Sequence, residues 1–592
     1  MSEYLDLRLE APETSLSELS FVETSSTALN QWAAGLPLAN IAETAAQLQI
    51  ATAELALLEA SAQDKYNFLE AVRPLLHYIC ARLDRSLFAA AKSAQEPQAQ
   101  RLLQNLCTGY KSVVLDSYAA RQKGASNDKS GHKDLLQRAL HRLISDLSRI
   151  LLRSLQLYVA PPDNFWRELN ELYRLSEMLE LTDFRLVDDE NHSDQPISIE
   201  AAYLRGLLLA SSKPNQLHHG QLSSVFSALE DWTAPVGLER GATDALLTID
   251  LLADSGPQYA KLVHDQAQPR GLHTEVLAYE IEAYLNDVDS RFVIPKALGR
   301  DLLTHLVEAW SVMQTRTFGR FATNVPVRVA VGLSASHYFL SGGCIFTDQL
   351  ANTDELLRRE VNPFLDVDYE ASHSEESDVW SQAHDLKVRM PQNPNIASPE
   401  TILIQKPAAE SQLRAFVHHE TVATDTSPGG YRMEWLDAVP SNATVGELVA
   451  LREEQAARWC VAVIRWIRQE GERISMGVEL LSPRAIPVAL RSIKKRGGPT
   501  NYARGLLLPE IEALNQTATI ITPVLPFAGR QKIQIQRQGI QTTGQLLKSQ
   551  LKTESFNQFT FRMLDGYLEN TRSDSNIDNL SAMTREDTNQ GP

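Results

Sequence analysis

Two arginines stand four residues apart near the middle of the chain, where an amphipathic helical pattern gives way to a run rich in β-branched residues. They are Arg316 and Arg320. A guanidinium group is planar and always ionised, so each can bind a phosphate, or the O6 and N7 edge of a guanine, and can also stack on a base. The pattern alone has a second reading, because arginines at this spacing are also common at a solvated helix end. Further motifs must decide between the two.

A second group of polar and small residues lies between two strand-like segments further along the chain. It consists of Asp425, Ser427 and Gly430, in the pattern DxSxxG. A carboxylate accepts hydrogen bonds and a hydroxyl donates or accepts them, while Gly429 and Gly430 permit positive φ and a close approach of the backbone to a ligand. Chance yields this pattern only roughly 0.1 to 0.2 times in a chain of this length. The alternative is a hairpin turn in which Asp425 and Ser427 bind their own backbone.

The charge balance limits what such a site could bind. The chain has 592 residues, of which 43% are hydrophobic, and its net charge is -18. A protein this acidic repels polyanions, so we expect no DNA or RNA partner. An anionic ligand should be small, and a local cluster of arginines should hold it.

Other candidates for chemistry are weaker. His218 and His219, like His418 and His419, are adjacent pairs without a third ligand at a fixed spacing, so no metal site is predicted. The basic run at 494–496 fits a solvated turn, with a phosphate or a protein partner as the lesser alternative. The sequence has no phosphate-binding P-loop, nucleophile elbow or HExxH motif. We therefore expect no catalytic residues, no cofactor and no enzymatic activity.

The cysteines and the N-terminal sequence bear on the compartment. Cys80, Cys107, Cys344 and Cys460 lie far apart, which predicts neither disulfides nor a zinc site. The acidic start lacks the apolar run of a secretion signal, and no segment has the 18 or so apolar residues that a membrane span needs. We therefore expect a cytoplasmic protein without membrane insertion.

Apolar periodicity indicates an α+β multidomain protein whose N-terminal part is all-α. After a flexible N-terminus at 1–30, the apolar residues of 31–300 recur mostly at helical spacing, for example at Leu136, Leu140, Leu143 and Leu147. A helical repeat is one reading of this domain. Because no fixed period is found, an irregular helical domain is the other.

The second half is predicted to be mainly β. Alternation starts at Val325, and strand-like segments resume at 413–424, so 301–490 is expected to form an antiparallel β-barrel with an acidic insertion at about 342–412. A second small β module is expected at 491–568, and a disordered tail at 569–592.

Taken in order, these motifs resemble one known family. The arginine pair, a strand, the DxSxxG pattern, and then Ile464-Arg465-Trp466 and Gly477-Val478-Glu479 resemble the PilZ domain, a bacterial receptor for the second messenger cyclic diguanylate (cyclic di-GMP). That family typically carries similar VRW and GVEF sequences in its barrel. One departure is the separation of some 80 residues between the first strand and the DxSxxG strand.

The resemblance implies a PilZ-like antiparallel barrel and a role for each motif residue. Arg316 and Arg320 would hold the phosphates and guanines of cyclic di-GMP, and Asp425, Ser427 and Gly430 would meet a guanine from the barrel surface. Arg328, Arg432 and Arg465 are nearby in sequence, each equally explained as a solvated strand charge. Proteins of this family take part in signal transduction, for example in motility, pili, exopolysaccharide and biofilm formation.

Two functional hypotheses follow. In the first, the chain is a cytosolic cyclic di-GMP receptor whose helical domain docks an unidentified protein partner, and the ligand reorders the Arg316–Arg320 arm between the two. In the second, the chain is a scaffold or chaperone-like adaptor whose barrel is degenerate and binds no nucleotide. The presence of both motifs favours the first hypothesis.

Overall fold

The structure, a computed structural model, describes fifteen stretches of the chain. They are residues 7–89, 96–122, 129–241, 244–296, 298–311, 321–350, 416–427, 429–436, 439–454, 456, 458–471, 473–493, 500–511, 516–537 and 540–564. Several predicted features lie outside them: the pair Arg316 and Arg320, most of the acidic insertion (351–412), the basic run 494–496 and the tail 569–592.

The chain folds into two compact units. The first comprises Met1–Phe321 together with Val439–Val445 and Arg465–Gly477, and the second comprises Ala322–Ala438, Gly446–Ile464 and Val478–Pro592. The tip of one hairpin from the second half of the chain thus belongs to the first, mainly helical unit.

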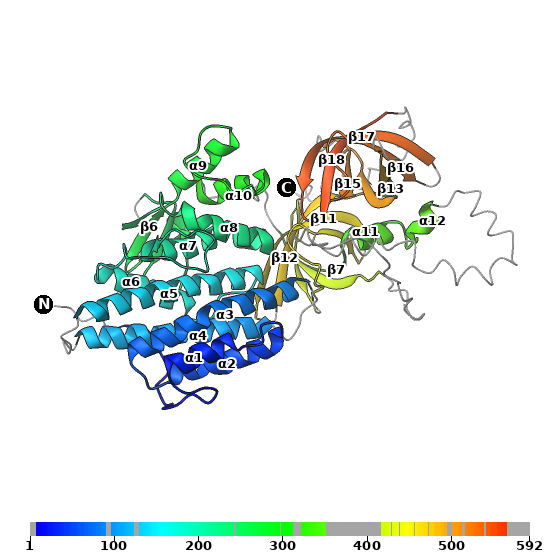
Figure 1. Cartoon of the computed structure of the whole chain (residues 1–592). Coiled ribbons are helices and arrows are strands. Elements are labelled where there is room, and N and C mark those ends of the chain that lie inside the picture. Colours follow the sequence, from blue (N-terminus) through cyan, green and yellow to red (C-terminus); the bar gives the residue numbers. More distant parts are fainter. Residues whose placement is uncertain are drawn as a thin grey trace, which may run out of the picture. The chain divides into compact units, whose positions relative to one another are not determined.

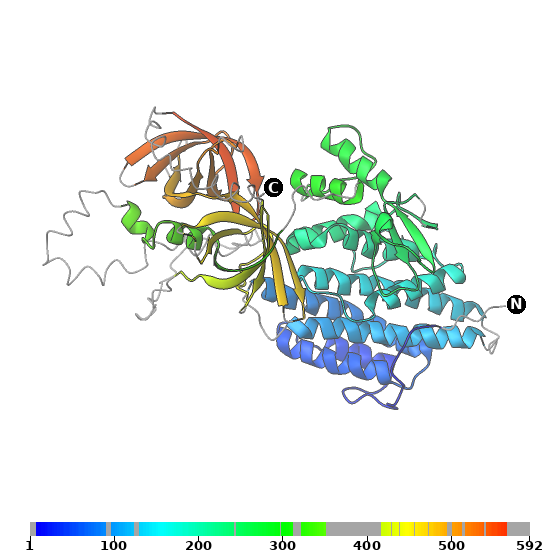
Figure 2. The same cartoon turned by 180° about the vertical axis from the view of Figure 1, so that it is seen from behind.

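Helices make up most of the first unit (Figures 1 and 2). They are α1 (Ser26–Ala34), α2 (Ile41–Leu57), α3 (Ala62–Ala89), α4 (Glu96–Gln122), α5 (Lys129–Gln156), α6 (Phe165–Met178), α7 (Ile199–Ser211), α8 (His219–Trp232), α9 (Glu275–Leu285) and α10 (Arg300–Ser311), with short 3-10 turns at Pro214–Gln216 and Ala260–Leu262. Their lengths range from 9 residues in α1 to 28 in α3 and α5, so the described helices do not form the equal pairs of a solenoid.

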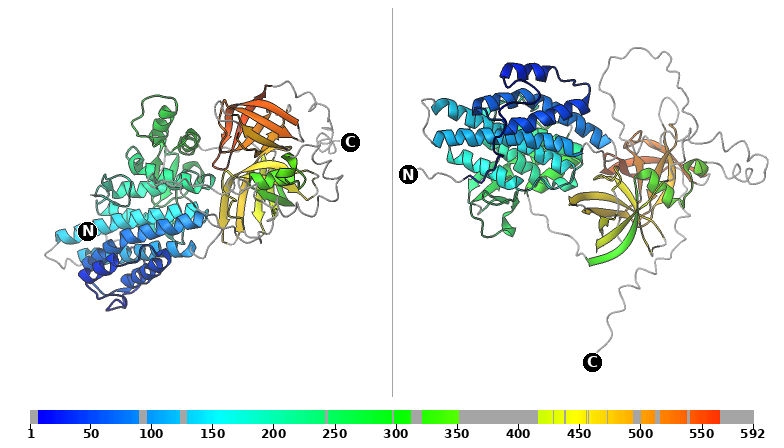
Figure 3. Two further views of the ribbon diagram at one scale, coloured as in Figure 1. Left: turned by 45° about the vertical axis from the view of Figure 1, so that its right-hand side comes forward. Right: turned by 90° about the horizontal axis from the view of Figure 1, so that it is seen from below.

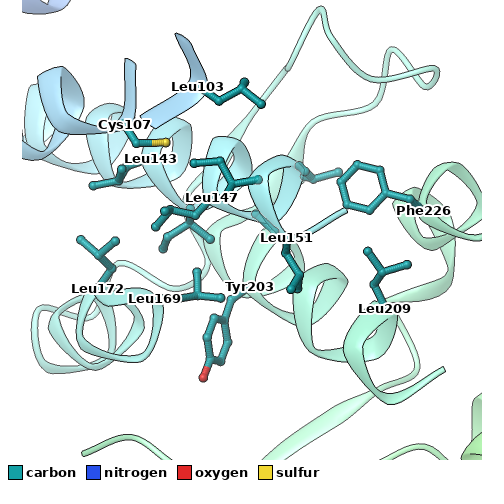
Figure 4. Packing of buried hydrophobic residues seen from close by; sticks show 14 of the residues in the cluster. Leu103, Cys107, Leu143, Leu147, Leu151, Leu169, Leu172, Tyr203, Leu209 and Phe226 are labelled. Atoms are coloured by element: carbon teal, nitrogen blue, oxygen red, sulfur yellow. The ribbon is translucent and has the colours of Figure 1, made fainter. Parts of the chain in front are cut away.

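Helix α5 is the centre of this unit, because every residue from Ala139 to Ser148 is buried. A helix that is buried on all sides packs against neighbours in several directions. Figure 4 shows its leucines meeting side chains of four other helices, namely Leu103 and Cys107 of α4, Leu169 and Leu172 of α6, Tyr203 and Leu209 of α7, and Phe226 of α8.

Charged residues inside this core are paired. Arg73 of α3 donates to both carboxylate oxygens of Asp146 at 3.0 and 2.8 Å, and to those of Asp188 at 2.7 and 3.0 Å. His77 also lies 3.0 Å from Asp146. Burial alone would raise the pKa of the Asp146 carboxyl, but Arg73 and His77 hold it well below its usual range. The network therefore holds α3, α5 and the loop around Asp188 together.

The helical unit also contains strands that the prediction of an all-α domain omitted. A two-stranded ribbon and a four-stranded sheet in the order β3-β6-β4-β5 are formed by β1 (Arg185–Leu186), β2 (Ile197–Ser198), β3 (Gly237–Arg240), β4 (Leu247–Asp250), β5 (Gln258–Tyr259) and β6 (Pro269–His273). These strands have only two to five residues, too few for an alternating pattern to stand out in a sequence.

Two closed antiparallel barrels make up most of the rest of the described chain (Figure 3). The middle barrel has the strand order β10-β11-β12-β9-β8-β7, formed by β7 (Phe321–Val331), β8 (His419–Ser427), β9 (Gly430–Trp435), β10 (Leu448–Glu453), β11 (Cys460–Glu470) and β12 (Arg473–Ser482). Strand β7 closes it by pairing with β10, for example Val329 with Leu451. A closed barrel leaves no strand edge unpaired.

The C-terminal barrel has the order β13-β14-β15-β18-β17-β16. Its strands are β13 (Ile486–Ser492), β14 (Ala503–Leu508), β15 (Thr519–Pro523), β16 (Lys532–Arg537), β17 (Ile540–Lys552) and β18 (Phe556–Met563). Strand β13 starts a few residues before the predicted boundary of this module at 491.

Two short helices, α11 (Leu333–Leu340) and α12 (Phe346–Leu350), follow β7. Leu333 of α11 shares one hydrophobic cluster with Leu448 of the middle barrel and with Leu506 and Phe556 of the C-terminal barrel. His337 lies in the same region, where its Nε2–H donates to the carbonyl oxygen of Val488 at 3.3 Å. The two barrels and α11 therefore share a core within the second unit.

Candidate functional site

The DxSxxG residues lie on the β8–β9 hairpin of the middle barrel. Strand β8 ends at Ser427, Gly429 lies in the turn, and β9 starts at Gly430. Ser427 and Gly430 are cross-strand partners, and Asp425 is the partner of Arg432. All of these side-chain positions belong to one short stretch of antiparallel ladder.

A β-bulge decides which way the motif faces. Ala423 pairs with Met433, yet Asp425 pairs with Arg432, so two residues of β8 oppose one step of β9. Ala423 and Met433 are buried inside the barrel at 1% and 0% exposure. In a regular strand Asp425, two residues after Ala423, would face inward as well. The bulge instead places Asp425 and Ser427 on the outer face of the hairpin.

Ser427 is engaged within the hairpin. Its hydroxyl donates to the carbonyl oxygen of Gly430 at 3.3 Å, which is the kind of backbone contact that the alternative reading of the motif foresaw. Ser427 and Asp425 are both half-buried. The hydroxyl oxygen of Ser427 has two lone pairs and can still accept a hydrogen bond from a ligand.

Gly430 is required by the packing of the barrel. Its φ is 152°, and a Cβ at this position would lie 1.9 Å from the carbonyl oxygen of Val478 in β12. Beside it, the N–H of Leu480 donates to the carbonyl oxygen of Gly429 at 2.9 Å. The hairpin turn and β12 therefore touch backbone to backbone, which only a glycine allows.

A similar close approach explains the later motifs. A Cβ on Gly477 of β12 would lie 1.9 Å from the indole Nε1 of Trp466 in β11. The indole therefore lies against the bare backbone of Gly477, and any side chain at position 477 would clash with it. This contact accounts for the tryptophan and the glycine without any ligand.

The three neighbouring arginines occupy different surroundings. Arg328 of β7 forms an exposed ion pair with Glu420 at 3.1 Å, so it is a strand-surface charge. Arg465 is half-buried on β11. Arg432 shares the outer face with Asp425, and its Nε is buried without a hydrogen bond to any described residue. Arg432 is the one of the three that faces the motif from the opposite strand.

Inside the barrel, Tyr431 anchors the start of β9. Its hydroxyl donates to Glu453 of β10 at 2.9 Å. Burial, together with this hydrogen bond, raises the pKa of Tyr431 above its usual range. The hairpin that carries the motif is thus fixed from within by a polar contact, which the sequence pattern gave no sign of.

The structure does not place the other two predicted site residues, because Arg316 and Arg320 lie outside the described residues. The histidine pairs have structural partners. His218 caps α8 by accepting the N–H of Gly220 at 3.2 Å, and His418 stacks edge-on near Phe339. Within the described ranges, no group of three His, Cys, Asp or Glu could hold a metal ion, and no helix could span a bilayer.

Comparisons with known proteins cover nearly the whole chain. Three family models match in order: the FimW N-terminal domain at residues 27–243, the middle PilZ domain of the cyclic-di-GMP receptor FimW at 246–487, and the FimW C-terminal β-barrel domain at 488–564. The cyclic-di-GMP receptor FimW of Pseudomonas aeruginosa is 30% identical over 599 residues, which span 96% of this chain and 95% of that protein. No solved structure matches.

Proposed function

The chain belongs to the FimW family of cyclic-di-GMP receptors, and on that premise we propose that it binds cyclic di-GMP at the outer face of the β8–β9 hairpin and passes the binding event to its helical unit. The matching family models describe domains of a receptor, which supports the expectation that the chain is not an enzyme.

The observation that carries the proposal is the bulge at Thr424. It brings Asp425, Ser427 and Arg432 to the same outer face next to the turn. Asp425 offers a carboxylate, the natural acceptor for the N1–H and N2–H₂ donors of guanine, and Ser427 offers a hydroxyl. Arg432 offers a buried N–H that has no acceptor among the described residues. One face thus combines groups suited to a guanine edge.

The proposed ligand needs positive charge as well. Cyclic di-GMP carries two phosphodiester groups, and the chain's net charge of -18 opposes its approach. We assign the compensating guanidinium groups to Arg316 and Arg320, which can bind phosphate oxygens or the O6 and N7 edge of a guanine. Gly430 acts indirectly, because its role is to let the turn rest on β12.

The route to the helical unit runs through β12. Its second half, from Val478, touches the motif at Gly429 and Gly430, whereas Arg473–Gly477 belongs to the first unit. At the tip of the same hairpin, the N–H of Gln469 donates to the carbonyl oxygen of Tyr158 at 2.8 Å, within the first unit. A shift of the turn on ligand binding would therefore be passed along one continuous strand.

A protein partner on the helical unit and a cytoplasmic location complete the proposal. The four cysteines are free, and Cys80 and Cys107 are buried as thiols, which fits a reducing compartment. Cyclic di-GMP is a second messenger, so its receptor needs an output, and we place that output on the helices of the first unit.

Titration of the purified full chain with cyclic di-GMP tests the binding proposal. The double substitution Arg316→Ala, Arg320→Ala should abolish binding and leave the melting temperature of the ligand-free protein almost unchanged. GTP serves as the control ligand and should give no comparable heat. If the wild-type chain gives no binding heat, the barrel is degenerate and the adaptor hypothesis replaces the receptor proposal. If the ligand-free variant has a clearly lower melting temperature than the wild type, the two arginines are structural.

Coupling is tested separately by hydrogen–deuterium exchange with and without saturating ligand. Peptides covering β11–β12 and the segment around Tyr158 should change their exchange on binding, in wild type but not in the arginine variant. If only the β8–β9 peptides respond although binding is tight, the receptor assignment stands and the proposed route through β12 is wrong.

A further inference from the structure

The C-terminal barrel has a charge opposite to that of the rest of the chain. Between residues 484 and 564 there are twelve Lys and Arg against three Glu and no Asp, which gives this module a net charge of +9 within a protein of net charge -18. The module contains none of the motif residues of the proposed cyclic di-GMP site. Its basic character therefore calls for a separate explanation.

Several of these cations gather on the outer face of β16, β17 and β18, the strands that lie side by side in Figure 1. Lys532 pairs with Gln545, and Gln545 pairs with Arg562, so the three form a row across the strands. The guanidinium of Arg562 donates to the Gln545 side chain at 2.7 and 3.1 Å, and the Gln545 amide donates to the carbonyl oxygen of Arg530 at 3.1 Å.

Lys548 is exposed further along β17, and its backbone N–H donates to the hydroxyl oxygen of Thr560 in β18 at 3.2 Å. We call the set Arg530, Lys532, Lys548 and Arg562 the cationic face. All four residues are exposed, and no described carboxylate forms an ion pair with any of them. Four uncompensated cations on neighbouring strands and the adjoining loop repel one another unless an anion binds them.

Exposed aliphatic side chains accompany the cations. Leu547, 39% exposed, precedes Lys548, and Leu525, 68% exposed, shares the β15–β16 loop with Arg530. Leu564 lies two residues after Arg562 and is 39% exposed. Each is a single side chain beside a cation rather than part of one contiguous apolar patch.

We propose that the cationic face of the C-terminal barrel adsorbs to the surface of a bilayer that contains anionic phospholipid, with Leu525 and Leu547 entering the headgroup region. Basic residues combined with exposed aliphatic ones are the pattern of interfacial membrane binding. A single-stranded nucleic acid would favour exposed aromatic rings for base stacking, and none of the described aromatic residues of this barrel is exposed. A protein partner would favour a contiguous buried anchor.

The acidic remainder of the chain does not forbid this. Exposed charges are largely screened beyond a distance of about 8 Å at physiological ionic strength, so a face of four cations senses mainly the lipid in front of it. Each cation near an anionic surface contributes about a fivefold increase in affinity, and four of them suffice for a weak, reversible and salt-sensitive attachment.

The test is flotation of the full chain with phosphatidylcholine vesicles, with and without phosphatidylglycerol. The wild type should float only with the anionic vesicles, and added salt should release it. Lys532→Glu with Lys548→Glu should weaken binding by roughly 25-fold or more, because two cations are lost and two repulsive charges are gained. Lys261→Glu with Lys296→Glu, the same charge change on exposed lysines of the helical unit, should bind like the wild type.

A second variant distinguishes lipid from other polyanions, and it keeps the proposal testable if the first variant misfolds. Leu525→Asn with Leu547→Asn keeps every charge and should weaken vesicle binding by at least about fivefold, while its binding of cyclic di-GMP stays as in the wild type. Four results would overturn the proposal: no flotation of the wild type, equal flotation with neutral vesicles, binding by the charge variant equal to wild type, or retention on poly(U) or polyglutamate without vesicle binding.

Discussion

Replacing Gly430 by alanine is the sharpest test of how the motif is held. The new Cβ would lie 1.9 Å from the carbonyl oxygen of Val478 and 3.1 Å from the Cα of Glu479. Both contacts are backbone atoms of β12, which cannot rotate out of the way. The turn and β12 must therefore move apart by about 1.5 Å to restore an ordinary contact.

The cost follows from what that separation breaks. The hydrogen bond from Leu480 to Gly429 would lengthen from 2.9 Å beyond hydrogen-bonding range, which removes about 1 kcal/mol. An alanine at a φ of 152° adds backbone strain of about 1–3 kcal/mol. We expect Gly430→Ala to destabilise the packing of β9 on β12 by about 2–4 kcal/mol.

Hydrogen–deuterium exchange of peptides from β9 and β12 measures this directly, and faster exchange by about 30-fold or more is expected there. Gly471→Ala is the matched control, because Gly471 also has positive φ, 58°, but a Cβ there meets nothing within 4 Å. The control should show only the strain, about 1 kcal/mol. If Gly430→Ala exchanges and melts like the wild type, the close approach of the turn to β12 is not what selects the glycine.

Three further predictions concern the site and the two units. Inserting an alanine between Arg432 and Met433 gives Thr424 a cross-strand partner, which removes the bulge and turns Asp425 toward the barrel interior, so cyclic di-GMP binding should be lost in a titration; binding that survives would contradict the role given to the bulge. Asp146→Asn leaves the buried Arg73 short of a carboxylate and should lower the free energy of unfolding of the helical unit by about 3 kcal/mol in urea titration, whereas an unchanged midpoint would show the network to be dispensable. Burial, with Arg504 nearby, lowers the pKa of His337 from 6.5 to about 3. The unfolded chain takes up a proton on this imidazole below pH 6.5, whereas the folded barrels do not. The free energy of unfolding should therefore decrease as the pH is lowered from 6.5 to 3, by up to about 1.4 kcal/mol per pH unit. His337→Leu should remove that slope, and equal slopes would argue against it.

The regular parts of the fold could be predicted because their patterns are local. Strand β16 lies within the β module that was expected at 491–568, and its Ile533 and Ile535 alternate with polar residues. The order of helical part, PilZ barrel and second β module is confirmed, as is the family resemblance. The boundary of that module was set too late, at 491, because Pro487 interrupts the pattern at the start of β13.

The parts that escaped prediction depend on contacts between distant residues. The sheet at β3–β6 is built from strands too short to show a period. Nothing in the sequence shows that Gly430 faces Val478, or that Tyr431 reaches Glu453 across the barrel. These contacts join residues from different strands.

The candidate site shows the same division. The DxSxxG pattern pointed to a turn between two strands, and the residues lie there. It could not show the direction of the side chains, because a single extra residue, Thr424, reverses the alternation that such an argument uses. The assignment of Asp425, Ser427, Gly430 and the two arginines to the ligand stays a prediction.

The most direct test of the receptor proposal is an isothermal titration of the full chain with cyclic di-GMP, run side by side with Asp425→Ala. We predict saturable binding at micromolar concentration or tighter by the wild type, and its loss in the variant, whose folded β8–β9 hairpin is verified by an unchanged melting temperature. Equal binding by both proteins would place the ligand elsewhere, and no binding by the wild type would contradict the receptor assignment.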